Sequence, residues 1–206
     1  KDTYVWHTIH EQNMRHRLTE ALCGYHEKYP YRYGMKKAEI HMTYMKKVKL
    51  NVFDLYVEML SEEGALKRHQ EFLQLPEFEV RKDAVYEKVL KTVQKQFEKV
   101  QFDFQRFSEI SFGNIKREEV EDIMLLLIDE DIVVKITEDI YTLKSIIEKA
   151  KEVIQNRLKE NPLITIAEVR DLLGTSRKSA KPILEYMDSI KVTKKNGTES
   201  ERVAYV

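Results

Sequence analysis

A pattern that occurs three times along the chain constrains its fold most. Each copy, about 60 residues long, holds a long stretch with helical apolar spacing, two shorter helical stretches, and a pair of strands with alternating character. Three helices followed by a two-stranded ribbon are typical of a winged helix. The pattern therefore predicts an α+β fold, mainly helical, built as a tandem array of three winged-helix domains. A tandem of unrelated α+β modules is the alternative. The domains are expected at residues 1–79, 80–143 and 144–206.

The last copy carries the clearest local signals. A helix is expected over residues 144–160, because Asn161 precedes a proline and such residues avoid helical geometry. Thr165 and Glu168 have the spacing of a capping box at the start of the next helix, which Gly174 ends. The segments around "KVTKK" and "RVAYV" predict a β-hairpin with a long, mobile loop.

Charge is distributed unevenly although the net charge of the 206 residues is zero. Residues 1–79 hold 12 Lys and Arg against 12 Asp and Glu, and residues 80–143 hold 10 against 14, a net charge of −4. Residues 144–206 hold 13 against 9, a net charge of +4. A uniformly basic nucleic-acid coat is thereby excluded, and positive charge gathers at the C-terminal end.

The stretch "GTSRKSAKP", residues 174–182, places three cations at the start of a helix. In a helix-turn-helix the second helix presents its N-terminal residues outward, where unpaired amides and the helix dipole favour phosphate. Thr175 or Ser176 is expected to cap the helix or to bond a phosphate oxygen, and Pro182 predicts an irregular opening. The alternative is that Ser176 only caps the helix and the cations are solvated. The cations at this start are Arg177, Lys178 and Lys181.

The predicted wing brings further candidates into the same domain. Its cations are Lys191, Lys194, Lys195 and Arg202, and Tyr186 offers an aromatic face nearby. Such a set suits a nucleic-acid backbone and one stacked base. A second basic stretch, at residues 36–37 and 46–49, reads either as a solubilising face or as a contact to RNA or a ribosomal surface.

Several classes of function are disfavoured. The pair His7 and His10 lacks converging partners, so no metal site is expected. No phosphate-binding glycine loop or catalytic triad pattern occurs, so we expect no enzyme activity in this sequence. The longest apolar run, residues 123–128, is too short for a membrane span. The single cysteine, Cys23, fits a reducing compartment, and we interpret the sequence as a fragment of a longer protein.

Three stretches carry a family resemblance: "YHEKYPYRYGMKKAEI", "FDLYVEMLSEEGALK" and above all "ITIAEVRDLLGTSRKSAKPILEYMD". They resemble the C-terminal region of the bacterial selenocysteine-specific translation elongation factors, the SelB family. Residues 1–5 would then be a remnant of a preceding unit. Lys191 and Lys181 depart from that family, in which a glycine and an uncharged residue are common at these positions.

The resemblance implies a function in translation. In the family the terminal winged helix binds an mRNA hairpin, the selenocysteine insertion element, downstream of a UGA codon. It further implies contact with the ribosome, selenocysteyl-tRNA held by an absent N-terminal GTPase part with GTP and magnesium, no cofactor in this fragment, no membrane, and a cytoplasmic monomer. The implied RNA-binding residues are Thr175, Ser176, Arg177, Lys178, Lys194, Lys195 and Arg202, to which the reading of the residues adds the cation Lys181 and the aromatic Tyr186.

Two other functions remain open from the sequence. A DNA-binding transcriptional regulator is also built from winged helices, but it would favour duplex DNA and usually work as a symmetric dimer. A protein-interaction scaffold would suit the acidic middle domain. If the mRNA-binding interpretation is right, the third domain alone retains most of the RNA affinity.

Overall fold

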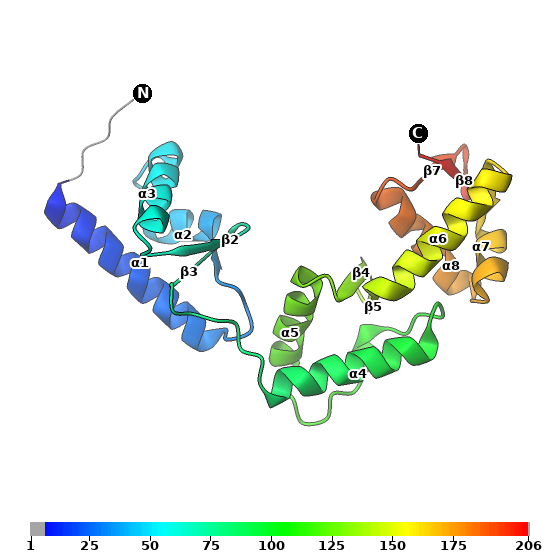
Figure 1. The fold of residues 1–206 in the computed structure, drawn as a ribbon, viewed down its shortest axis with the longest axis horizontal. Coiled ribbons are helices and arrows are strands. Elements are labelled where there is room, and N and C mark those ends of the chain that lie inside the picture. The colour runs from blue at the N-terminus through cyan, green and yellow to red at the C-terminus, as the bar shows by residue number, and fades with distance from the viewer. Residues whose placement is uncertain (1–6, 206) are drawn as a thin grey trace. The chain divides into compact units, whose positions relative to one another are not determined.

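The computed structural model describes residues 7–205, so the remnant expected at residues 1–5 lies outside the described residues. Contacts divide the chain into two compact units, Lys1–Asp83 and Ala84–Val206. The second unit contains both the middle and the last copy of the repeated pattern (Figure 1). The tandem winged-helix fold is confirmed, whereas the division into three domains at residues 79 and 143 stays a prediction.

The first unit forms one winged helix around a single core. Its sheet has the antiparallel order β1-β3-β2, in which Met35 of β1 pairs with Leu73 of β3. Gly34 precedes β1 at a close approach, since a Cβ built there would lie 2.1 Å from the Leu73 carbonyl oxygen. The elements are α1 (Thr8–Lys28), β1 (Met35–Lys36), α2 (Lys37–Tyr44), α3 (Leu50–Glu62), β2 (Lys67–His69) and β3 (Phe72–Gln74).

The middle copy departs from the expected pattern at its second helix. Only a single 3₁₀ turn, η1 (Phe107–Glu109), stands between α4 (Ala84–Val100) and α5 (Arg117–Asp129). Residues 101–116 are rich in aromatic residues without helical spacing and include Gly113 at φ 67°, so they favour an irregular connection. The hairpin follows as β4 (Val133–Thr137) and β5 (Ile140–Leu143).

The last copy follows its local signals closely. Thr165 caps α7 by accepting a hydrogen bond from the Glu168 amide at 3.2 Å, and the Glu168 carboxylate accepts from the Thr165 amide at 2.9 Å. Gly174 ends α7 at φ 59°. The capping box and the glycine stop are therefore confirmed. The elements are α6 (Lys144–Glu160), β6 (Leu163–Thr165), α7 (Ile166–Leu173), α8 (Arg177–Ser189), β7 (Thr193–Asn196) and β8 (Thr198–Ala204).

The hairpin loop and the opening of α8 differ from expectation. Asn196 pairs with Thr198 across Gly197, whose φ of 72° allows a tight reversal, so the expectation of a long loop is wrong. Helix α8 runs as an α-helix through Pro182. The Ala180 amide donates to the Ser176 carbonyl at 2.9 Å, so the first turn is regular and the expected irregular opening is absent.

Two buried residues of the middle copy belong to the hydrophobic core of the last copy. Phe104 and Val134 from the middle copy belong to the same buried cluster as Ile154, Ile164 and Ile183 of the last copy. Sheet order β6-β8-β7 places β8 centrally, with α8 packed on this cluster. The segment after α4 is thereby held against the last winged helix, which positions the start of α8.

Candidate nucleic-acid interface

Packing on one side of α8 fixes which residues its first turn exposes. Ala180, Ile183 and Leu184 are completely buried, and they follow one another at helical spacing. Arg177 and Lys178 precede this stripe on the exposed side of the helix. The apolar side of α8 therefore packs on the core and fixes the helix, while the first two cations of the helix remain in solvent.

The hydroxyl groups at the start of α8 face the neighbouring repeat. The Thr175 hydroxyl donates to the Phe102 carbonyl oxygen at 2.6 Å, and the Ser176 hydroxyl donates to the Asp103 carboxylate at 2.7 Å. Ser176 makes no side-chain capping bond. The expectation that one of these hydroxyls caps α8 is thus wrong, and neither is free to bond a phosphate oxygen in this arrangement.

Asp103 takes the place of a capping residue, although it lies more than 70 positions earlier in the sequence. Its carboxylate also accepts from the Ser179 hydroxyl at 3.3 Å, and the Phe104 amide donates to that hydroxyl at 3.0 Å. The hydrogen bond from Ser176 is the largest cause that lowers the pKa of Asp103, with a smaller contribution from the charge of Lys178. A negative charge at a helix N-terminus stabilises the helix.

Arg177 and Lys178 form the open cationic part of this surface. Among residues 7–205, neither has a carboxylate within ion-pair distance, and both are exposed. Lys181 lies one turn later and pairs with Glu185 at 3.7 Å, in an exposed contact of small energy. The structure therefore brings the three predicted cations of α8 together and leaves the first two available.

The wing cations separate into exposed and buried ones. Lys194 is exposed, and Lys195 is exposed but pairs with Glu199 at 2.6 Å. Arg202 is only 1% exposed and donates to the Asp188 carboxylate at 2.6 Å. It also donates to two backbone carbonyls of β8. Its burial contradicts the expectation that Arg202 presents its guanidinium to RNA, since this side chain ties the wing to α8.

The aromatic candidate changes as well. Tyr186 is half-buried against the core of the last repeat, so its ring is a poor platform for stacking a base. Burial also raises the pKa of its hydroxyl group. Tyr205, which sequence reasoning did not select, is 48% exposed. The ammonium groups of Lys191 and Lys194 lie 6.0 Å and 5.8 Å from its ring centre. The place of Tyr205 directly after β8 was the available signal, since its backbone amide donates to the Val192 carbonyl just before β7.

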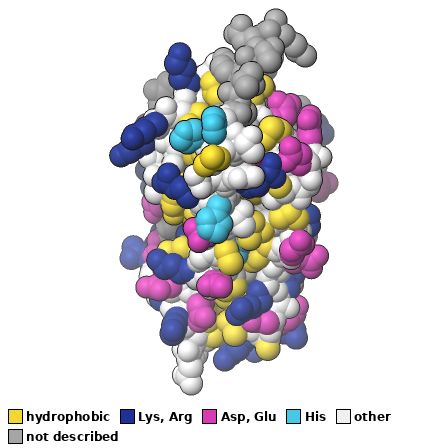
Figure 2. Space-filling model, turned by 90° about the vertical axis from the view of Figure 1, so that its left-hand side faces the viewer, with side chains coloured by type: hydrophobic (Ala, Val, Ile, Leu, Met, Phe, Trp, Pro, Cys, Tyr) yellow, Lys and Arg dark blue, Asp and Glu magenta, His cyan; other side chains and the backbone are white. Residues whose placement is uncertain are grey.

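The first unit presents a different surface. Figure 2 shows a face on which basic and acidic side chains are interspersed. Lys36 pairs with Glu71 at 2.9 Å and Lys37 with Asp54 at 2.7 Å, whereas residues 46–49 keep exposed lysines before α3. The basic stretch of this unit is thus partly neutralised, as a solubilising face would be.

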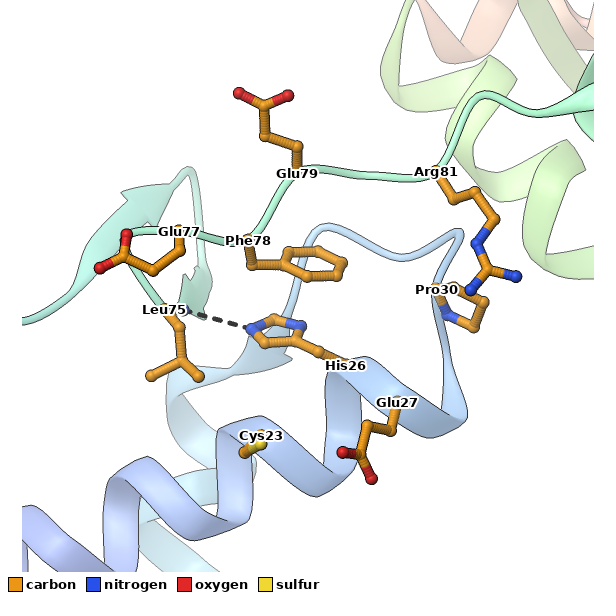
Figure 3. A pocket seen from close by; sticks show the side chains of 9 residues that line it. All are labelled: Cys23, His26, Glu27, Pro30, Leu75, Glu77, Phe78, Glu79 and Arg81. Atoms are coloured by element: carbon orange, nitrogen blue, oxygen red, sulfur yellow. Dashed lines mark hydrogen bonds between the residues drawn. The ribbon is translucent and has the colours of Figure 1, made fainter.

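A pocket of about 400 Å³ lies in the first unit between the end of α1 and the segment after β3 (Figure 3). His26 stacks on Phe78 with ring centres 3.6 Å apart, and its Nε2 accepts a hydrogen bond from the Leu75 amide at 3.2 Å. Burial lowers the pKa of His26 to about 4, which keeps the ring neutral. This is a structural histidine in an aromatic stack.

Neither a metal cluster nor a membrane span is found in the described part of the chain. Within residues 7–205, no group of three His, Cys, Asp or Glu side chains converges as metal ligands would. No described helix combines the length and apolar character that crossing a bilayer requires. The expected absence of a cofactor remains a prediction.

The fold and this surface define a tandem winged-helix protein with an open cationic start on its last recognition helix. Comparison with known families then matches two ranges to the description "Elongation factor SelB, winged helix". Residues 19–75 match its second winged-helix domain and residues 156–200 match its third. These two matches confirm the resemblance to the winged-helix domains of elongation factor SelB that was stated from the sequence. Neither range covers the middle repeat.

Individual relatives agree with this family. A selenocysteine-specific elongation factor from Desulfomicrobium baculatum is 24% identical over 185 residues, which cover 88% of this chain and 29% of the relative. The chain thus spans less than a third of that curated relative. These matches favour the translation factor over the DNA-binding regulator.

Two solved structures are also similar. The crystal structure of the bacterial selenocysteine-specific elongation factor EF-Sec covers 97% of this chain and 30% of its own, with a TM-score of 0.53 and 17% identity, which supports the fold. The mRNA-binding domain of elongation factor SelB from E. coli, solved in complex with SECIS RNA, covers 57% of this chain and 98% of its own. Its TM-score is 0.47 and its identity 20%.

Proposed function

We propose that this chain is the mRNA-binding region of a selenocysteine-specific elongation factor, and that its last winged helix binds the hairpin that marks a UGA codon for selenocysteine. One observation carries the proposal: the recognition helix of a SelB-type winged helix opens with two exposed, unpaired cations, Arg177 and Lys178. Such a helix start supplies amide donors, a positive dipole end and full charges to phosphate.

The shape of RNA explains why this surface suits a hairpin. The major groove of A-form RNA is too deep and narrow for a recognition helix, so sequence is read from splayed-out bases in loops. In our proposal Arg177 and Lys178 bind phosphates of the hairpin loop. Lys194, beside the exposed ring of Tyr205, offers a second contact in which a loop base stacks on the tyrosine.

A substitution at the helix start tests the proposal. Arg177→Ala should weaken hairpin binding by about 1–3 kcal/mol at fixed salt, because a charged contact to RNA is lost. The matched control is Arg170→Ala, since Arg170 is exposed on α7 and already paired with Asp171 at 2.6 Å. Hairpin affinity that is equal in wild type and Arg177→Ala would refute the assignment.

A comparison of ligands separates the classes of function. A gel shift with the RNA hairpin, the same RNA with a mutated loop, and duplex DNA should show preference for the first. Preference for duplex DNA would indicate a transcriptional regulator, and binding to none would indicate a protein scaffold.

The remaining expectations concern the whole protein and are part of the proposal. A GTPase part with GTP and magnesium would hold selenocysteyl-tRNA, while this region acts without enzyme activity, metal or cofactor of its own. It would work as a monomer at the ribosome, in the cytoplasm. The first unit and the middle repeat would then separate the hairpin contact from the rest of the factor.

A further inference from the structure

The middle repeat is acidic overall, yet one face of its first helix is basic. Lysines occupy positions 88, 91, 95 and 99 of α4, and all four are exposed. With 3.6 residues per turn these positions fall within about 80° of the helix circumference. The row rises about 17 Å along the helix at 1.5 Å per residue.

Three of these lysines have no ion pair among the described residues, whereas two other cations of the repeat are closely paired. Arg117 pairs with Glu121 at 2.9 Å and Lys135 with Glu138 at 2.8 Å. In the row, by contrast, the described residues give Lys91 alone an ion pair, and its distance to Glu87 is 4.0 Å. Like charges one turn apart destabilise a helix by about 0.2–0.5 kcal/mol per pair. A polyanion laid along the row would relieve this repulsion.

The recognition helix of the middle repeat points to the opposite charge. Helix α5 begins at Arg117, which pairs with Glu121 at 2.9 Å, and has Glu118 and Glu119 in its first turn, so its start favours phosphate less than that of α8. The row on α4 is therefore the stronger candidate for a nucleic-acid contact by this repeat. Lys88, Lys91 and Lys95 border one open hollow on that helix, together with one acidic residue, Glu87.

The row leads to the start of α8. Lys99 lies four residues before Asp103, whose carboxylate accepts the hydrogen bond from Ser176. The exposed cations Arg177 and Lys178 follow directly. Within the second unit, the segment that follows the lysine row is thus hydrogen-bonded to the surface proposed to hold the hairpin loop.

We propose that Lys88, Lys91, Lys95 and Lys99 form a track that binds the RNA phosphate backbone outside the hairpin loop. This inference rests on the proposed function. At about 3.4 Å of axis per phosphate along one strand, a row of this length spans about five phosphates. The contact is independent of sequence, because ammonium groups on phosphates carry no base information.

Other anionic partners fit this face less well. A membrane helix needs an apolar face to insert, but Val89, Val93 and Phe97 of α4 are buried in the protein core. A protein interface would need apolar or aromatic anchors at its centre, where lysine is depleted. RNA needs only the row of charges.

The test replaces three lysines of the row by glutamine, which keeps length and helix propensity. The full chain with Lys88→Gln, Lys95→Gln and Lys99→Gln is titrated with a minimal hairpin and with a hairpin whose stem and flanks are extended. We expect the slope of log affinity against log salt to fall by about 2–3 for the extended RNA, and its affinity to fall roughly tenfold at moderate salt. Discrimination against a mutated loop should persist.

The matched control carries the same change in charge on strand β4 and helix α6: Lys135→Gln, Lys149→Gln and Lys159→Gln. Equal salt slopes for the row variant and this control on the extended RNA would overturn the track. Unchanged RNA binding together with lost binding to polyglutamate would overturn it in favour of an acidic protein partner. Equal affinity of the wild-type protein for the native and the mutated loop would instead refute the proposed function. The salt slope on the extended RNA would still show whether the lysine track binds RNA.

Discussion

Asp103 should control the stability of the helix start that we assign to RNA binding. Its carboxylate holds Ser176 at 2.7 Å and Ser179 at 3.3 Å, and it provides the negative charge at the N-terminus of α8. A hydrogen bond to a charged group contributes about 1.5–3 kcal/mol when buried. Because Asp103 is exposed, solvent screening reduces the contribution to about 1 kcal/mol. We therefore expect Asp103→Ala to destabilise the second unit by about 1–2 kcal/mol, including the dipole effect.

The pH dependence has a definite sign. The pKa of Asp103 is lowered in the folded protein, first by the hydrogen bond from Ser176. Its contribution is therefore complete above the ordinary pKa of 3.8 and is lost as the pH falls through the lower folded value. Asp103→Asn keeps an acceptor for Ser176 but should remove this acid-sensitive part of the stability.

Urea unfolding of the full chain and hydrogen exchange of the first α8 amides measure the effect. Asp171→Ala is the matched control, since Asp171 is exposed on α7 and touches its neighbour Arg170. Asp103→Ala should speed exchange at residues 179–181, whereas the control should not. If both variants unfold and exchange alike, the contacts of Asp103 contribute no stability and the reasoning fails.

Three further substitutions test single features of the fold. His26→Gln should flatten the loss of stability between pH 6.5 and about 4, worth about 3 kcal/mol at most, because a lowered histidine pKa makes stability fall with the pH. Gly34→Ala should destabilise the first unit by about 1–3 kcal/mol in thermal unfolding, since its Cβ would meet the Leu73 carbonyl. Arg202→Ala should cost about 3 kcal/mol in urea unfolding, the lower end for breaking a buried ion pair, because the Asp188 carboxylate that loses its partner is 21% exposed.

Each of these has a control on a nearby exposed residue. His16→Gln removes a histidine that is 72% exposed and should change the free energy of unfolding by less than about 0.5 kcal/mol. Gly24→Ala places a Cβ where no atom lies within 4 Å and should be tolerated. Lys195→Ala removes an exposed wing cation and should cost less than 1 kcal/mol. A variant that behaves like its control would contradict the corresponding contact.

Local signals predicted the fold because they act over a few residues. The capping box of Thr165 and Glu168 and the stop at Gly174 each depend on neighbours in sequence, and both are present. The second helix of the middle repeat was overestimated, because a contact distant in sequence holds this segment: the Phe107 amide donates to the Asp139 carbonyl at 2.8 Å. Tertiary context decided that segment, which the threefold pattern alone did not reveal.

The chemistry of the candidate site was harder to predict because it depends on contacts between distant residues. Ser176 looked like a capping residue, but its hydroxyl is taken by Asp103. Arg202 looked like a wing cation, but the Asp188 carboxylate at the end of α8 holds its guanidinium in the interior. Arg177 and Lys178 were placed correctly on the exposed side because the apolar stripe of α8 leaves no other orientation.

The last winged helix should depend on the middle repeat, contrary to the expectation that residues 144–206 alone retain most of the RNA affinity. Phe104 lies in the core of that domain at 9% exposure, and residues 102–104 hold the Thr175 and Ser176 hydroxyls. A fragment of residues 144–206 loses these contacts, so its α8 start should fray and bind the hairpin about tenfold more weakly than residues 84–206, or about 1.4 kcal/mol. Titration of both fragments at one salt concentration measures this. Equal affinities would mean that α8 keeps its RNA-binding geometry without the contacts from residues 102–104.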